Sequence, residues 1–82
     1  MTPPVKERVY RVVAGVLNVP VERITDESDP DTITSWDSLS HLTLVLALES
    51  EFHVTLTDDD VTDMLSVGLI CRIVTERGAV DA

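Results

Sequence analysis

Cysteine, aromatic residues and basic residues are scarce in this sequence, and each shortage excludes a class of protein. One cysteine in 82 residues excludes an internal disulfide and a zinc site of several thiolates, and it suits a reducing compartment, so we expect a cytoplasmic protein. Three aromatic side chains provide little material for a deep substrate cleft. Six basic residues against 15 acidic ones, a net charge of −9, disfavour nucleic acid as a partner.

Long apolar runs are also missing. The sequence contains no run of about 18 apolar residues and no short apolar segment behind a basic start. We therefore expect no signal peptide, no membrane anchor and no membrane partner. The chain is shorter than the roughly 100 residues of a common domain, so we expect residues 1–82 to form one monomeric domain with a single core. Leu, Ile, Val and Phe make up about a third of the residues, which is enough for the chain to fold.

The negative charge is concentrated in the middle of the chain. Residues 22–63 carry twelve acids and a single base, Arg23, whereas residues 1–21 have a net charge of +2 and residues 64–82 a net charge of 0. Charge concentrated in this way speeds encounters with basic protein surfaces, although it also serves solubility alone. We therefore expect partners with basic docking patches.

The first part of the chain predicts one helix followed by a long loop. Valines recur at intervals of three and four over about residues 4–18, and Asn18 ends this pattern. Residues 19–36 hold two prolines and few apolar residues, a composition typical of an ordered loop that positions something. The apolar anchors expected in this loop are Val21, Ile24 and Ile33.

The rest of the chain predicts three more helices, so the fold class is all-α. The longest runs from Leu39 to Phe52, with Asp37 as its N-cap and Ser38 in its first turn. A loop at 53–56 precedes a short acidic helix and a last helix that ends at Gly78. The short helix should have Thr57 as its N-cap, Asp58, Asp59 and Asp60 in its first turn, and Val61, Met64 and Leu65 on its apolar side. The last helix should have Ser66 as its N-cap. We predict a small four-helix bundle with a short third helix.

Two apolar stripes follow the longest of these helices. Projected at about 100° per residue, the wider stripe holds Leu44, Val45, Leu48 and Phe52, and the narrower one holds Leu39, Leu42 and Leu46. We expect the wider stripe to face the core. The narrower stripe either stays exposed as a docking surface or is buried in the core, and the spacing alone leaves both open.

Ser38 lies where the long loop meets the positive end of the longest helix. Its hydroxyl should be exposed there, at a place where the helix N-terminus tolerates a phosphate diester. From local physical chemistry alone, Ser38 could equally be a simple capping serine.

A wider pattern surrounds this serine. Asp37-Ser38-Leu39 is followed by Leu42, Leu44 to Leu46, Ala47-Leu48-Glu49 and Glu51-Phe52, and then by Thr57-Asp58-Asp59, Val61, Met64 and Val67. This pattern resembles the acyl carrier proteins over residue 4 to about residue 78. The tripeptide alone is weak, but the tripeptide together with the phased leucines, the acidic middle and the domain length is specific.

The resemblance implies a carrier and not an enzyme. Ser38 would bear a covalent 4′-phosphopantetheine arm, which a separate phosphopantetheinyl transferase takes from coenzyme A. The arm would hold acyl groups as thioesters and deliver them to acyl-loading and acyl-processing enzymes of fatty-acid or polyketide-type biosynthesis. The surface that these enzymes contact would consist of Asp37, Leu39, Leu42, Leu46, Glu49, Asp58 and Asp59.

Trp36 and His41 depart from the usual fatty-acid carriers, which have a small or aliphatic residue before the Asp and an acid soon after the Leu. A tryptophan before Asp37 looks more like free-standing carriers of specialised pathways. Peptidyl carriers commonly have glycines before the serine, and this chain has none between Val19 and Asp37. The acyl cargo and the pathway are therefore left open.

Other functions fit the sequence less well. Ser38 and His41 lie one helical turn apart, but a hydrolase also needs an oxyanion hole and a third orienting group in a cleft. We therefore interpret His41 as a boundary residue or a partner-contact residue, the commoner roles of a histidine on a helix surface. The rival function is an acidic helical protein-interaction module without a prosthetic group, which would use the same charge and the same leucines.

The acidic loop does not match a calcium-binding hand. A loop that starts at Asp26 would need glycine at its sixth position and glutamate at its twelfth, and those positions hold Asp31 and Asp37. We predict no specific metal site. Weak divalent binding that relieves repulsion among the acids is a separate hypothesis.

Overall fold

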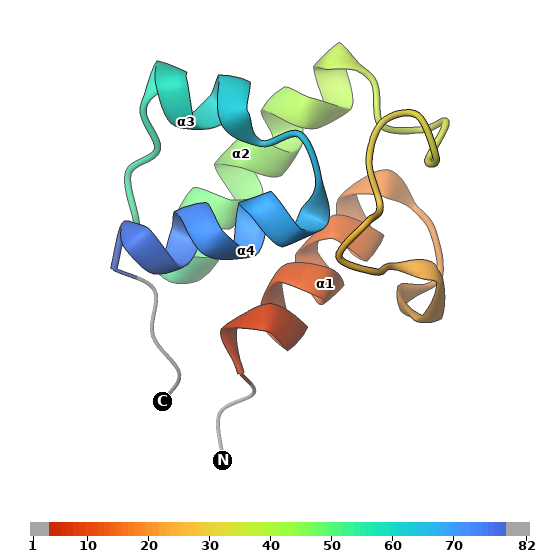
Figure 1. Cartoon of the computed structure of the whole chain (residues 1–82), viewed down its shortest axis with the longest axis horizontal. Helices are drawn as coiled ribbons and strands as arrows, with labels where there is room; N and C mark the ends of the chain where they lie inside the picture. Colours follow the sequence, from red (N-terminus) through yellow and green to blue (C-terminus); the bar gives the residue numbers. More distant parts are fainter. Residues whose placement is uncertain (1–3, 79–82) are drawn as a thin grey trace.

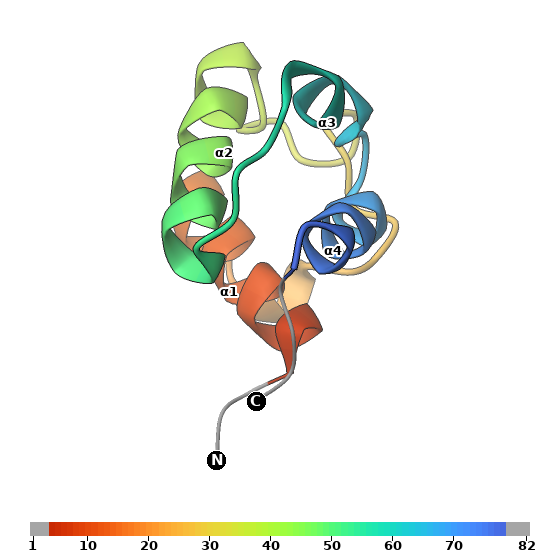
Figure 2. The same cartoon turned by 90° about the vertical axis from the view of Figure 1, so that its left-hand side faces the viewer.

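A computed structural model describes residues 4–78, and within them every regular element is helical. The elements are α1 (Val5–Leu17), the short 3₁₀ helix η1 (Val21–Arg23), α2 (Ser38–Phe52), α3 (Asp58–Asp63) and α4 (Val67–Glu76). Helix α1 packs against both α2 and α4. The short helix α3 lies beside the N-terminal half of α2 (Figures 1 and 2). The all-α bundle with a short third helix is the predicted fold.

Side-chain caps begin three of the four α-helices at the residues that the sequence predicts. The Asp37 carboxylate accepts a hydrogen bond from Ser40 N, and the Ser66 hydroxyl accepts one from Leu69 N. Thr57 and Asp60 form a reciprocal capping box at the start of α3. Each cap satisfies backbone N–H groups that have no partner inside the helix, which is why short polar residues mark these boundaries.

Left-handed residues end the two longer helices. Asn18 follows α1 with φ 57°, and His53 follows α2 with φ 55°. Asparagine and histidine adopt this conformation more readily than most residues, so each provides a stop without glycine. Gly78, with φ 114°, follows α4 as the sequence predicts.

The core is formed by apolar side chains from α1, α2 and α4. Leu44, Val45, Leu48 and Phe52 of α2 are all buried, so the wider stripe faces the core as predicted. Residues of α1 and α4 that pack in the same cluster include Val9, Val13, Leu17, Ile70 and Val74. Four residues outside the helices, Ile24, Trp36, Leu56 and Met64, complete it.

The loop that leads to α2 is attached to α1 and α4. Asp26 accepts hydrogen bonds from Tyr10 Oη and Lys6 Nζ of α1, and its carbonyl accepts one from Gly68 N at 2.9 Å. A Cβ atom at residue 68 would lie 3.2 Å from that carbonyl oxygen, so glycine permits this close approach. The loop is ordered because both neighbouring helices hold it.

Two predicted apolar contacts are wrong. Val21 lies in η1, which the sequence analysis missed, and it is exposed, whereas Ile24 is buried and Ile33 packs partly against the core. Leu65 was predicted on the apolar side of the short helix, but α3 ends at Asp63 and Leu65 is 63% exposed. In both cases only one of two neighbouring apolar residues reaches the core, because the chain turns between them.

Candidate functional site

Ser38 is the first residue of α2, and its side chain is exposed. Asp37 precedes it as the N-cap, with Ser40 N at 2.8 Å from Asp37 Oδ1. Within residues 4–78 the Ser38 hydroxyl has no hydrogen-bond partner, because the capping bond uses Asp37 instead. The hydroxyl is therefore open to a reagent that approaches from solvent.

The electrostatics at this helix end come from the Asp37 carboxylate and the backbone. Hydrogen bonds from Ser40 lower the pKa of Asp37 below its usual range, so the carboxylate is charged at neutral pH. Its charge complements the positive end of the α2 dipole. Ser38 thus sits beside a fixed negative charge that a basic partner surface can approach.

The narrower leucine stripe of α2 is exposed. Leu39, Leu42 and Leu46 are 74%, 58% and 67% exposed. This result selects exposure over core burial, the alternative that the helical spacing left open. Three exposed leucines on one stripe, starting next to Ser38, form an apolar patch of the kind that marks binding surfaces.

A groove lies beside Ser38, between the start of α2 and the short helix α3. Its volume is about 520 Å³. The residues that line it are Pro30, Trp36, Asp37, Ser38, His41, Leu42, Val61, Thr62, Met64 and Leu65. Most of these side chains are apolar, so the groove presents an apolar wall next to the serine hydroxyl.

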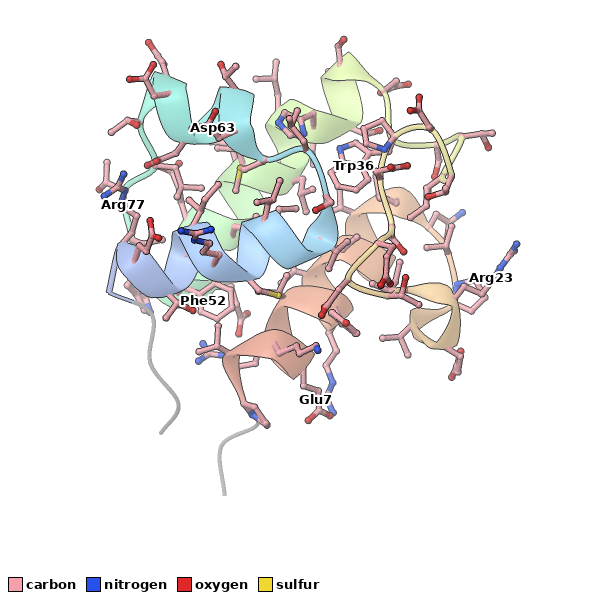
Figure 3. All side chains as sticks on the ribbon, in the orientation of Figure 1. Glu7, Arg23, Trp36, Phe52, Asp63 and Arg77 are labelled. Carbon is pink, nitrogen blue, oxygen red and sulfur yellow. The ribbon has the colours of Figure 1, made fainter. Side chains whose placement is uncertain are left out.

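Trp36 and His41 are bonded to each other beside the groove. Trp36 is 3% exposed and belongs to the core, and Figure 3 shows its side chain at the junction of the loop and α2. Its Nε1–H donates to His41 Nδ1 at 3.0 Å, and His41 Nε2 lies 2.9 Å from Val61 O. His41 is partly buried, as expected for a residue at the boundary between core and surface, and both of its ring nitrogens have partners inside the domain.

Glu49 has an internal bond that the sequence did not indicate. Its side chain is half-buried, and its Oε2 accepts a hydrogen bond from Leu56 N at 2.9 Å. This bond ties the loop after α2 back to the helix. The Glu49 side chain therefore stabilises the loop after α2, and this role does not depend on contact with a partner.

The three aspartates that open α3 lie in different surroundings. Asp58 and Asp59 are exposed, whereas Asp60 is buried. Arg77 donates to both Asp60 oxygens, at 2.7 and 2.8 Å, and Figure 3 shows Arg77 at the edge of the molecule beyond the end of α4. The Arg77 guanidinium lowers the pKa of Asp60 far below its usual range.

The described residues offer little chemistry of their own. Both His41 nitrogens are engaged, so this histidine is not free to act as a base toward Ser38. Burial raises the pKa of Cys71 to about 11, which keeps its thiol protonated at neutral pH. Among residues 4–78, no three His, Cys, Asp or Glu side chains are grouped to hold a metal ion. No helix in that range is long and apolar enough to cross a membrane.

Known proteins are similar to this chain in sequence and in fold. A family model described as "Phosphopantetheine attachment site" matches residues 7–74. Acyl carrier proteins of Caulobacter vibrioides (strain NA1000 / CB15N) and Phenylobacterium zucineum are each 32% identical over 73 residues, which is 89% of this chain and 94% and 92% of theirs. The solution NMR structure of holo acyl carrier protein from Geobacter metallireducens matches the fold with a TM-score of 0.79 at 22% identity, covering 88% of this chain and 83% of that one.

Proposed function

The chain belongs to the acyl carrier protein family, and from this premise we propose that Ser38 carries the prosthetic group. Members of the family are carriers and not enzymes, and they hold acyl groups on a covalently bound 4′-phosphopantetheine. The family match does not identify the modified residue, so the attachment site is inferred from the exposure and hydrogen bonds of each serine.

The observation that carries this proposal is the free, exposed Ser38 hydroxyl at the start of α2. Three other serines are occupied or buried: Ser35 Oγ donates to Leu17 O, Ser66 caps α4, and Ser28 is 6% exposed. Ser50 is exposed, but it lies near the C-terminal end of α2, away from the positive end of the helix dipole. Ser38 also borders the apolar groove, so an attached arm has a surface to lie against. The residues present therefore fit the group.

Attachment needs an external catalyst. The Ser38 oxygen loses its proton and forms an ester bond to phosphorus, while a pyrophosphate bond of coenzyme A breaks and the nucleotide portion leaves. No base within residues 4–78 is positioned for this proton, because His41 is engaged on both sides. The transferase must supply it. Once attached, the arm provides a thiol that holds an acyl group as a thioester.

Delivery to enzymes with basic docking patches follows from the surface. The proposed partner surface comprises Asp37, Leu39, Leu42, Leu46, Glu49, Asp58 and Asp59. Exposed carboxylates raise the encounter rate, and the exposed leucines give a contact small enough to be released quickly. We propose fatty-acid or polyketide-type biosynthesis as the setting. Trp36 before Asp37 favours a specialised pathway.

The test is modification by a promiscuous phosphopantetheinyl transferase and coenzyme A, followed by intact-mass measurement. We expect the wild type to gain one phosphopantetheinyl group and Ser38→Ala to gain none. Ser50→Ala is the matched control, because Ser50 is exposed near the other end of α2. It should be modified like the wild type.

Two results would refute the assignment. An unmodified wild-type chain would leave an acidic helical interaction module without a prosthetic group. Full modification of Ser38→Ala would move the attachment site to another residue.

A further inference from the structure

His41 links three parts of the molecule that are separate in the sequence. It lies in α2, one turn after Ser38, and it bonds to Trp36 of the preceding loop and to Val61 of α3. All three residues line the groove next to Ser38. One side chain therefore joins the loop, α2 and α3 at the end of the molecule where Ser38 is exposed.

The chemistry of the two bonds fixes the protonation of the ring. An indole Nε1–H can only donate, so His41 Nδ1 must present its lone pair to Trp36. The ring proton then lies on Nε2, where it donates to Val61 O. The Trp36 and His41 rings are inclined by only 21°, which suits a bond in which the N–H and the lone pair both lie in the ring planes. The neutral Nε2–H tautomer satisfies both contacts.

This second bond holds the far end of α3. The helix has six residues, and Val61 is in its last turn, where its carbonyl accepts a long bond from Met64 N at 3.4 Å and has room for the shorter bond from His41. The beginning of α3 is held by the Arg77 pair with Asp60. His41 therefore provides the side-chain connection from the end of α3 to α2, while Arg77 connects the beginning of α3 to the end of α4.

We propose that His41 is a positioning residue for partner recognition, because it holds α3 at a fixed place beside Ser38. The exposed carboxylates of Asp58 and Asp59 then face a partner together with the serine and the exposed leucines of α2. Without the bond from His41 to Val61 O, the aspartates of α3 would move relative to Ser38 and the exposed leucines of α2. This inference rests on the proposed function.

Two substitutions each remove one of the two His41 hydrogen bonds and keep the other. His41→Asn keeps an acceptor near the position of Nδ1 and loses the bond to α3, whereas His41→Gln keeps a donor near Nε2 and loses the bond to Trp36. The chain has one tryptophan, so its single indole N–H resonance reports the Trp36 bond. His53→Asn is the control, since it makes the same change at the other histidine, which is exposed, in a left-handed position that asparagine tolerates.

The expected results are opposite for the two variants. His41→Asn should raise the KM of the transferase for the carrier roughly threefold to tenfold, with kcat unchanged, because a hydrogen bond of ordinary strength is lost from the binding surface. Its indole resonance should stay in place. His41→Gln should shift the indole resonance and leave KM close to that of the wild type and of His53→Asn. A purely structural role would lower the melting temperature and leave KM unchanged.

Several outcomes would overturn the proposal. If the transferase modifies the wild type and its KM for folded His41→Asn is unchanged, His41 has no positioning role. The carrier function would not be affected by this result. Nitrogen shifts that place the ring proton of wild-type His41 on Nδ1 would do the same, even if neither variant folds. A wild type that the transferase does not modify would remove the carrier function itself, and this inference with it.

Discussion

The leucines of α2 and the aspartates of α3 are both divided between buried and exposed positions. On α2, Leu44 and Leu48 are fully buried while Leu42 and Leu46 are largely exposed. On α3, Asp60 is buried against Arg77 while the two preceding aspartates, Asp58 and Asp59, face solvent. In each helix one residue type serves both the interior and the surface.

The difference shows what decides the role of a residue here. A helix turn places side chains on different faces at fixed angles, but only the neighbouring elements decide which face is covered. Helix α2 is covered along its wider stripe by the core. Helix α3 is covered at Asp60, where Arg77 reaches back from the end of α4, and at Val61, which packs partly against the core and bonds to His41. The uncovered leucines and aspartates are exposed to solvent and belong to the partner surface that we propose.

Truncating a buried leucine should have the largest effect on folding. Leu48→Ala removes a side chain with 0% exposure from the core and should lower the free energy of unfolding by about 2–5 kcal/mol. The measurement is urea denaturation at neutral pH, with the melting temperature as a second measure. A loss below about 1 kcal/mol would show that the core of α2 is loosely packed, and the contrast between the stripes would disappear.

Lowering the pH should reduce the difference in stability contribution between the buried Asp60 and the exposed aspartates of α3. The pKa of Asp60 is lowered in the folded state by Arg77 and Thr57, so its contribution to stability is complete at neutral pH. The contribution declines as the pH falls below the unfolded value of about 3.9 toward the folded pKa. We expect Asp60→Asn to lower the urea midpoint at neutral pH, by less than Leu48→Ala, because Arg77 is partly hydrated.

The control for this prediction is Asp59→Asn, which changes an exposed carboxylate next to Asp60. Its urea midpoint should stay close to that of the wild type. The gap between the wild type and Asp60→Asn should narrow at about pH 3. A gap that is constant from neutral pH to pH 3 would mean that the Asp60 carboxylate does not stabilise the fold through its charge.

The smallest effect on folding is expected at the exposed stripe. Leu46→Ala should change the free energy of unfolding by no more than about 0.5 kcal/mol, because the side chain is 67% exposed. It should nevertheless weaken recognition by a partner enzyme. The measurement is the KM of the phosphopantetheinyl transferase for the carrier in the modification assay, which should be higher than for the wild type. Equal KM values for Leu46→Ala and the wild type would remove Leu46 from the proposed partner surface.

Local rules predicted most of the backbone from the sequence. The caps Asp37, Thr57 and Ser66, the stop at Asn18 and the buried stripe of α2 all depend on residues within one or two turns of one another. The exposure of Ser38 depends on the same local geometry, because Asp37 takes the capping role and leaves the next residue free.

Most of the missed features join residues that are distant in the sequence, whereas η1 and the bond from Leu56 to Glu49 are local. The bond of His41 to Val61 spans 20 residues, and the Asp60–Arg77 pair spans 17. The burial of Trp36 beneath the loop likewise depends on how the helices pack. Two signals were available and were not used: a lone tryptophan seldom remains in solvent, and a histidine one turn further along can accept its N–H.

The contact between the loop and α4 has a consequence for synthesis on the ribosome. Asp26 and Ser28 accept backbone hydrogen bonds from Gly68 and Val67, so the segment before Ser38 gains its support from residues translated some forty positions later. A nascent chain that stops short of α4 can form α1 and α2, and α1 can hold the loop through Lys6 and Tyr10, but the two backbone bonds to α4 are still missing. The loop before Ser38 therefore gains its full set of contacts only when α4 has been synthesised.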